Sequence, residues 1–182
     1  MTIKFVGMLL AATVSTASFA QTPPPPPPPE AKTSAKPYVM AAGMSDLYEI
    51  NSSKVALQKS QTPAIRQFAT MLIKHHQKTT AATVKAATKA GLTPTPPVLD
   101  AGATASINEL QTASAADFDR LYVGQQVPAH QAALDLHQSY SSGGDQAPLR
   151  MSAKAAVPIV KQHLDAAMKM QAGKPMANMS GM

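Results

Sequence analysis

From residue 38 onward, the spacing of apolar side chains leaves little choice of fold. Apolar residues recur every three or four positions over long stretches, and no part of this region alternates with the period of two that a β-strand requires. Short breaks at residues 60–63 and 141–144 join these stretches in pairs, and a longer break at 94–113 separates the pairs. We therefore predict helices at residues 38–60, 63–90, 114–140 and 145–172, with a short helix near 103–111 in the long connection.

Two helical hairpins joined by a long crossover are the topology of a ferritin-like four-helix bundle. The composition agrees with this all-α prediction, because 45% of the residues are hydrophobic and many of these are Ala, which lets helices pack closely. A chain of 182 residues has room for one ordinary domain. We predict that this domain, the bundle, covers residues 38–172.

The first twenty residues have the composition of a secretory signal peptide. Lys4 precedes an apolar run at residues 5–14 that is too short to span a bilayer, and Ser18 and Ala20 fit the small-residue positions before a cleavage site. We expect cleavage after Ala20 and export of the chain, into the periplasm or beyond. No later apolar run is long enough for a membrane helix, so we expect no transmembrane span.

A proline-rich, disordered linker is expected at residues 21–37. Seven consecutive prolines at residues 23–29 predict a polyproline II rod of about 3.1 Å per residue, and a stiff spacer is the favoured interpretation. Such a stalk could carry the bundle toward an envelope surface or a protein partner; the sequence sets no oligomeric state. At the other end, residues 173–182 are expected to form a disordered tail that contains methionines.

Charge and cysteine content exclude several classes of function. The formal net charge is +6, but the basic residues are dispersed and lack interleaved aromatic residues, so we expect no binding to nucleic acid. The absence of Cys excludes a disulfide scaffold, a thiolate zinc site and an iron–sulfur cluster. The sequence also lacks a glycine-rich phosphate loop and a serine nucleophile elbow, and we expect a non-catalytic protein.

The strongest functional lead is a set of polar residues on the inner faces of the predicted helices. Four of them share a helical face with aliphatic or small residues and should point into the core: Glu49, His76, His130 and His163. Counted from the hairpin turns, Glu49 and His76 lie at similar heights, within about 3 Å, whereas His130 and His163 differ by about 10 Å. The orientation of His75 is less clear from the pattern, and His137 lies two turns after His130, near the end of its predicted helix.

Several short motifs, taken in order, resemble a known family. They are YVMAAGMSDLYEI at residues 38–50, FATM at 68–71 before His76, FDRLY at 118–122 before His130 and Gln131, and VP at 157–158 before His163. Together they resemble the bacterial exported family called domain of unknown function 4142, over about residues 38–170. The family usually has Asp-His where this chain has His75-His76. The resemblance implies a ferritin-like fold.

Two interpretations of the inner polar residues remain open. In the first, one metal ion such as Zn, Mn, Fe or Cu is bound by one ligand from each helix: Glu49, His76, His130 and His163. In the second, these residues form a buried hydrogen-bonded network that fixes helix register. The sequence favours the network, because a likeness of fold is weak grounds for a site. A di-iron centre is disfavoured, because no carboxylate precedes any of these histidines by three residues.

We therefore expect an exported helical bundle with a non-catalytic binding or stress-protective role in the envelope. The alternative is a mononuclear metal-binding protein, with redox activity as an option, that uses the inner Glu and His residues. A second alternative is weak copper capture by the C-terminal methionines, because thioether sulfur selects Cu(I). For these methionines, a disordered tail without a ligand is the favoured interpretation.

Overall fold

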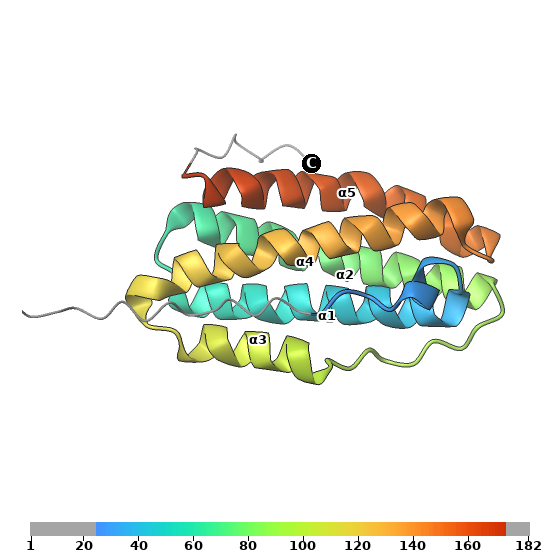
Figure 1. Cartoon of the computed structure of the whole chain (residues 1–182), viewed down its shortest axis with the longest axis horizontal. Helices are drawn as coiled ribbons and strands as arrows, with labels where there is room; N and C mark the ends of the chain where they lie inside the picture. Colours follow the sequence, from blue (N-terminus) through green and yellow to red (C-terminus); the bar gives the residue numbers. More distant parts are fainter. Residues whose placement is uncertain (1–24, 174–182) are drawn as a thin grey trace, which may run out of the picture.

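The computed structural model describes residues 25–173, which contain helices and loops and no strand. The helices are η1 (Pro29–Lys32, a 3-10 helix), α1 (Ala35–Lys59), α2 (Pro63–Lys89), α3 (Ala101–Thr112), α4 (Ala115–Gly143) and α5 (Ala147–Gln171). The hairpins α1–α2 and α4–α5 form a bundle (Figure 1), which confirms the predicted all-α fold. None of the described helices is long and apolar enough to cross a membrane. The predicted signal peptide (1–20) and residues 174–182 of the predicted tail lie outside the described residues.

Local sequence signals set the ends of the helices. Pro63 occupies the first turn of α2, where its lack of an N–H leaves no bond unmade. After α2, Gly91 adopts a φ of 78°, a left-handed conformation that favours glycine and ends the helix. Asp100 and Ser114 cap α3 and α4, because their side chains accept hydrogen bonds from backbone N–H groups of the first turn. These signals explain why most predicted boundaries agree with the structure to within a few residues.

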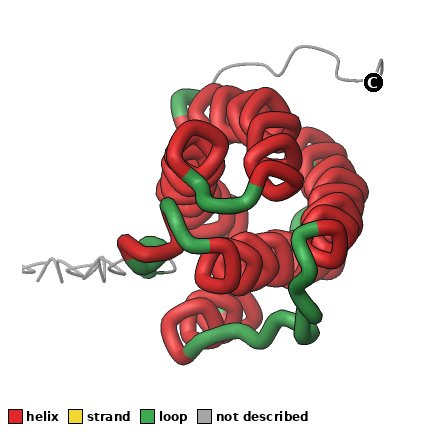
Figure 2. The backbone as a smooth tube through the Cα atoms, turned by 90° about the vertical axis from the view of Figure 1, so that its right-hand side faces the viewer, coloured by secondary structure: helices red, strands yellow, loops and turns green. Residues whose placement is uncertain are grey.

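The long crossover runs outside the four bundle helices. It leaves the end of α2, passes along the bundle and enters α3, which lies beside α1 on the outside of the bundle (Figures 1 and 2). Leu110 of α3 is fully buried and Ile107 is 8% exposed, so this short helix is fixed by apolar packing. The helix predicted at residues 103–111 is therefore present, with slightly wider bounds.

The N-terminal boundary of the bundle differs from the one predicted at residue 37. Ala31 of η1 and Ala35 of α1 are buried, and the Nζ atom of Lys32 lies 2.7 Å from Oδ2 of Asp135 on α4. Pro37 lies in the first turn of α1, where a helix tolerates proline because the N–H there has no intrahelical acceptor. Residues 29–37 thus belong to the packed structure, and the predicted linker is shorter than residues 21–37.

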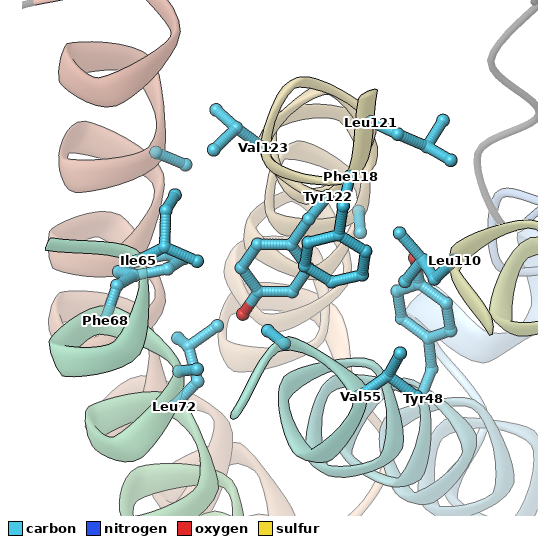
Figure 3. Close-up of a cluster of buried hydrophobic side chains, with 14 of the residues drawn as sticks. Tyr48, Val55, Ile65, Phe68, Leu72, Leu110, Phe118, Leu121, Tyr122 and Val123 are labelled. Atoms are coloured by element: carbon cyan, nitrogen blue, oxygen red, sulfur yellow. The ribbon is translucent and has the colours of Figure 1, made fainter. Parts of the chain in front are cut away.

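The core consists of apolar clusters on either side of a polar layer. The larger cluster joins α1, α2, α3, α4 and α5, and its bulkiest members (Figure 3) are Tyr48, Phe68, Leu72, Leu110, Phe118 and Tyr122. Toward the other end, Tyr38 of α1 stacks on Tyr140 of α4 with ring centroids 3.9 Å apart. His76, His130 and His163 lie between these clusters along α2, α4 and α5. Packing at both ends thus holds the helices in register around the polar layer.

Candidate metal centre

The four inner polar residues come from four different helices and are all buried. Glu49 lies on α1, His76 on α2, His130 on α4 and His163 on α5, and none is more than 2% exposed. This burial is what the helical stripes predict. Each of these residues is shielded from water, so its polar atoms must find partners inside the bundle or remain unsatisfied.

The three histidines meet at one point in the bundle. Their ring centroids are 5.1 Å apart for His76 and His163, 5.3 Å for His130 and His163, and 5.7 Å for His76 and His130. One nitrogen from each ring belongs to a group of atoms that all lie within 4.8 Å of one another. Glu49 lies beside this group, with its Oε1 atom 3.8 Å from Nδ1 of His130.

The height difference of about 10 Å expected between His130 and His163 is wrong. The structure continues α4 to Gly143 and begins α5 at Ala147, so the turn is later than the sequence suggested. Measured from these ends, the two histidines are 13 and 16 residues away, a difference of about 4.5 Å at 1.5 Å per residue. The residual offset is small enough for the two rings to meet.

Each histidine is oriented by a hydrogen bond from one of its two ring nitrogens. Nδ1 of His76 lies 2.8 Å from Oδ1 of Asp46, and Nδ1 of His130 lies 2.9 Å from the backbone oxygen of Gln126. A carboxylate and a carbonyl oxygen can only accept, so each Nδ1 carries the proton and donates it. In the neutral form of either ring, the other nitrogen, Nε2, therefore keeps a free lone pair.

His163 is held by a second histidine. Its Nε2 atom lies 2.9 Å from Nδ1 of His75, which is the neighbour of His76 on α2 and is partly exposed. In the tautomer in which His163 donates this bond, its own Nδ1 keeps the free lone pair. Hydrogen bonds on the outer side of metal-binding histidines fix the ring and the tautomer in the same way.

The inward atoms of this group have no partner. Among the described residues, Nε2 of His76, Nε2 of His130 and Nδ1 of His163 make no hydrogen bond, and neither do the two carboxyl oxygens of Glu49. A closed hydrogen-bonded network would satisfy these atoms, because leaving a buried polar atom unsatisfied costs about 1–3 kcal/mol. The arrangement fits a ligand set better than a self-contained network.

Burial and Asp46 decide the protonation of the site. Burial lowers the pKa of His130 to about 3, and burial together with the nearby histidines lowers the pKa of His163. At His76, burial opposes the charged form, but the hydrogen bond to Asp46 outweighs it and the pKa is raised. Burial raises the pKa of Glu49 to about 7, although nearby His76 offsets part of the rise. His130 and His163 are therefore neutral near pH 7, and neutral imidazole is the form that binds metal.

Asp46 is not among the site residues predicted from the sequence, and the pattern did not predict the direction of His75. Asp46 is 5% exposed, and Thr79 and Thr80 also donate to its carboxyl group. Its signal was its spacing, because a residue three positions before Glu49 lies on nearly the same helical face. His137 is likewise buried, and its Nδ1 atom lies 3.0 Å from the hydroxyl of Tyr38, away from the three-histidine group.

Comparison with known families gives a direct match. The sequence profile of the family described as "Domain of unknown function (DUF4142)" matches residues 20–170. The chain belongs to this family. Its match extends the resemblance seen over residues 38–170 toward the N-terminus. No curated protein matches the chain.

Solved structures of two other kinds share the fold. CopM in its Cu(I)-bound form is similar with a TM-score of 0.65 at 15% identity, over 77% of this chain and 96% of that chain. CopM in its Cu(II)-bound form gives 0.65 at 14% identity, over 77% and 97%. A DUF305 fragment from Deinococcus radiodurans gives 0.66 at 14% identity, over 82% and 99%. At these identities the likeness concerns the fold alone.

Proposed function

We propose that this DUF4142 protein binds one transition-metal ion between His76, His130 and His163. The observation that carries the proposal is the close approach of three buried imidazoles, each of which has one ring nitrogen without a hydrogen-bond partner among the described residues. One nitrogen of each ring is already hydrogen-bonded, so the rings are held in place before the metal arrives. Glu49 would supply the carboxylate beside the metal and balance part of its charge.

Copper is the preferred metal. Imidazole ligands suit Cu, Zn, Fe and Ni, and Cu(II) stands highest among the divalent ions in the usual order of affinity. The structures of CopM that share this fold hold Cu(I) and Cu(II), which gives copper a further advantage. The residues three positions before these histidines are Ile73, Val127 and Val160, so the chain lacks the Glu-x-x-His pairs of a di-iron centre.

We propose, from the sequence, that the protein is exported to the cell envelope. A signal peptide at residues 1–20 would export the protein, and a proline-rich segment before the bundle would act as a stalk. The role would be to hold metal in the envelope without catalysis, as protection against metal stress. This proposal replaces the hydrogen-bonded network favoured by the sequence, because the inward atoms are unpaired.

Metal stoichiometry tests the proposal directly. The exported chain, purified without a His-tag, would be loaded with Cu(II), Zn(II), Mn(II) or Fe(II), and anaerobically with Cu(I), then desalted and analysed by mass spectrometry. We expect about one copper per chain, and nitrogen hyperfine structure in the electron paramagnetic resonance spectrum of the Cu(II) form. His130→Gln and His163→Gln should abolish both signals. His137→Gln is the matched control, because it removes a buried histidine outside the group.

Two outcomes would overturn the assignment. If no metal is retained under any loading condition, the histidines are structural. If the His130→Gln variant keeps its copper but loses it after removal of residues 173–182, the C-terminal methionines are the site.

A further inference from the structure

The three histidines proposed as ligands are closed off from solvent. His76, His130 and His163 are 2%, 1% and 0% exposed, so a metal ion can reach them only through groups that line a way in. Metal binding therefore also depends on which residue connects each ligand to the surface. The inference that follows rests on the proposed function of this same site.

For two of the three ligands, the outer ring nitrogen is bonded to a buried group that is already engaged in hydrogen bonds. The Nδ1 atom of His130 donates a hydrogen bond to the backbone oxygen of Gln126, inside α4. The Nδ1 atom of His76 donates to Asp46, whose carboxyl group also accepts hydrogen bonds from the hydroxyls of Thr79 and Thr80. Both hydroxyls also donate to the backbone oxygen of His76, so this side is tied down by hydrogen bonds.

The third ligand leads to another imidazole. Nε2 of His163 lies 2.9 Å from Nδ1 of His75, and the two rings are nearly parallel, with an interplanar angle of 16°. His75 is only partly buried, which makes it the one histidine that both contacts a proposed ligand and reaches the surface among residues 25–173. His75 thus connects the surface to the buried histidines through imidazole nitrogens, the same kind of metal ligand that the buried histidines offer.

The tautomer of the His75–His163 pair decides which of the two rings has a nitrogen lone pair free to bind a metal ion. When His163 donates the bond, its inward Nδ1 has the free lone pair. When His75 donates it, the other nitrogen of His75, Nε2, has the free lone pair instead. The same short contact therefore supports a metal outside or inside the bundle.

We propose that His75 is the first ligand of the incoming metal ion, which then passes to His163 and the buried histidines. The transfer is an exchange of ligands without a change of oxidation state. Because Lys74 and Lys78 lie near His75 and repel a bare cation, a metal carried as a neutral complex with a small amino acid is the form best suited to this route.

The test separates access from affinity. A residue that only provides a way in lowers the barrier for loading and for release equally, so its loss slows both rates and leaves the dissociation constant unchanged. The loss of a residue that only orients His163 instead raises the dissociation constant, because removing such a partner weakens metal affinity by about 10–100-fold. Cu(II)–glycine is a suitable probe for loading by stopped flow, and a chelator in excess measures release.

Two substitutions of His75 make the distinction. His75→Gln retains a carbonyl that can accept the bond from His163, whereas His75→Ala removes the bond. We expect both variants to load copper at least about tenfold more slowly, equivalent to about 1.4 kcal/mol of barrier. In His75→Gln, which keeps a partner for His163, release should slow equally and leave the dissociation constant unchanged, whereas His75→Ala should also bind copper more weakly. His137→Gln should match the wild-type rates. Circular dichroism would confirm that each variant is folded.

Two results would overturn the role of His75. One is loading that is unchanged or faster in both variants. The other is a His75→Gln variant that loads copper at the wild-type rate while affinity falls in His75→Ala, which would make His75 a positioning residue alone. The failure of the wild-type protein to bind copper stoichiometrically would instead overturn the proposed function, and this inference with it.

Discussion

Glu49 makes the metal-free protein sensitive to pH in a direction that can be worked out from its surroundings. Its carboxyl group is 2% exposed, and neither oxygen has a hydrogen-bond partner among the described residues. Burial disfavours the charged form and raises the pKa of Glu49 from 4.5 to about 7. Between these two values, the unfolded chain has released the proton and the folded chain still holds it.

The free energy of unfolding must therefore fall as pH rises through this window. The contribution of Glu49 is fully present below pH 4.5 and is lost as pH rises through about 7. A gap of about 2.5 pH units corresponds to about 3 kcal/mol. Replacement of Glu49 with Gln keeps the size of the side chain and removes the titration. The Gln variant should therefore gain about 3 kcal/mol over the wild type between pH 4.5 and pH 8.

Urea unfolding of the two metal-free proteins, treated with chelator, measures this difference across the pH range. Groups that are not coupled to Glu49, such as His137, are common to both proteins and cancel in the comparison. His76 does not cancel, because Glu49 contributes to its raised pKa, so its titration is part of the measured difference. Copper should reverse the order, because a bound cation favours the ionised carboxylate and stabilises the wild type more than the variant. A difference between the two metal-free proteins that stays constant from pH 4.5 to 8 would refute the reasoning.

Three further substitutions test the second ligand layer, the crossover and the α4–α5 turn. Asp46→Asn should weaken copper affinity by about 10–100-fold in a competition titration, because it removes the charge behind a ligand ring. Leu110→Ala should lower the free energy of unfolding in urea by about 2–5 kcal/mol, because this side chain anchors α3 and is fully buried. In Gly144→Ala, the new Cβ would lie 2.5 Å from Cε1 of Tyr140, so we expect a loss of about 1–3 kcal/mol. Gly143→Ala is its matched control, because a Cβ there would meet no atom within 4 Å beyond its own stretch of helix, and its free energy of unfolding should change by less than about 0.5 kcal/mol.

The helices could be predicted because their signals are local. Pro63, Gly91 and the break near residue 144 act on the backbone directly, whatever the rest of the chain does. The exception at Pro37 has the same cause. Proline breaks a helix in its interior but is accepted in the first turn. Only the packing of Ala31 and Ala35 shows that α1 begins before Pro37 and places it in the first turn.

The inward direction of the site residues could also be predicted, but their meeting could not. Periodicity along each helix placed Glu49 and the three histidines on inner faces, and all four are buried. The height of His163 relative to His130 depends on where the turn between α4 and α5 falls. An error of a few residues in that turn moved the expected position by several ångströms.

The sequence by itself determined the all-α class, the two hairpins and the burial of one carboxyl and three imidazoles. These follow from a period of 3.6 residues and from helix-ending residues, which need no knowledge of distant parts of the chain. Only the tertiary structure decided which ring nitrogen is engaged and which is free, and that Asp46 and His75 stand behind two of the rings. Those facts depend on contacts between helices far apart in sequence, which rest on the packing of the core clusters and on helix register.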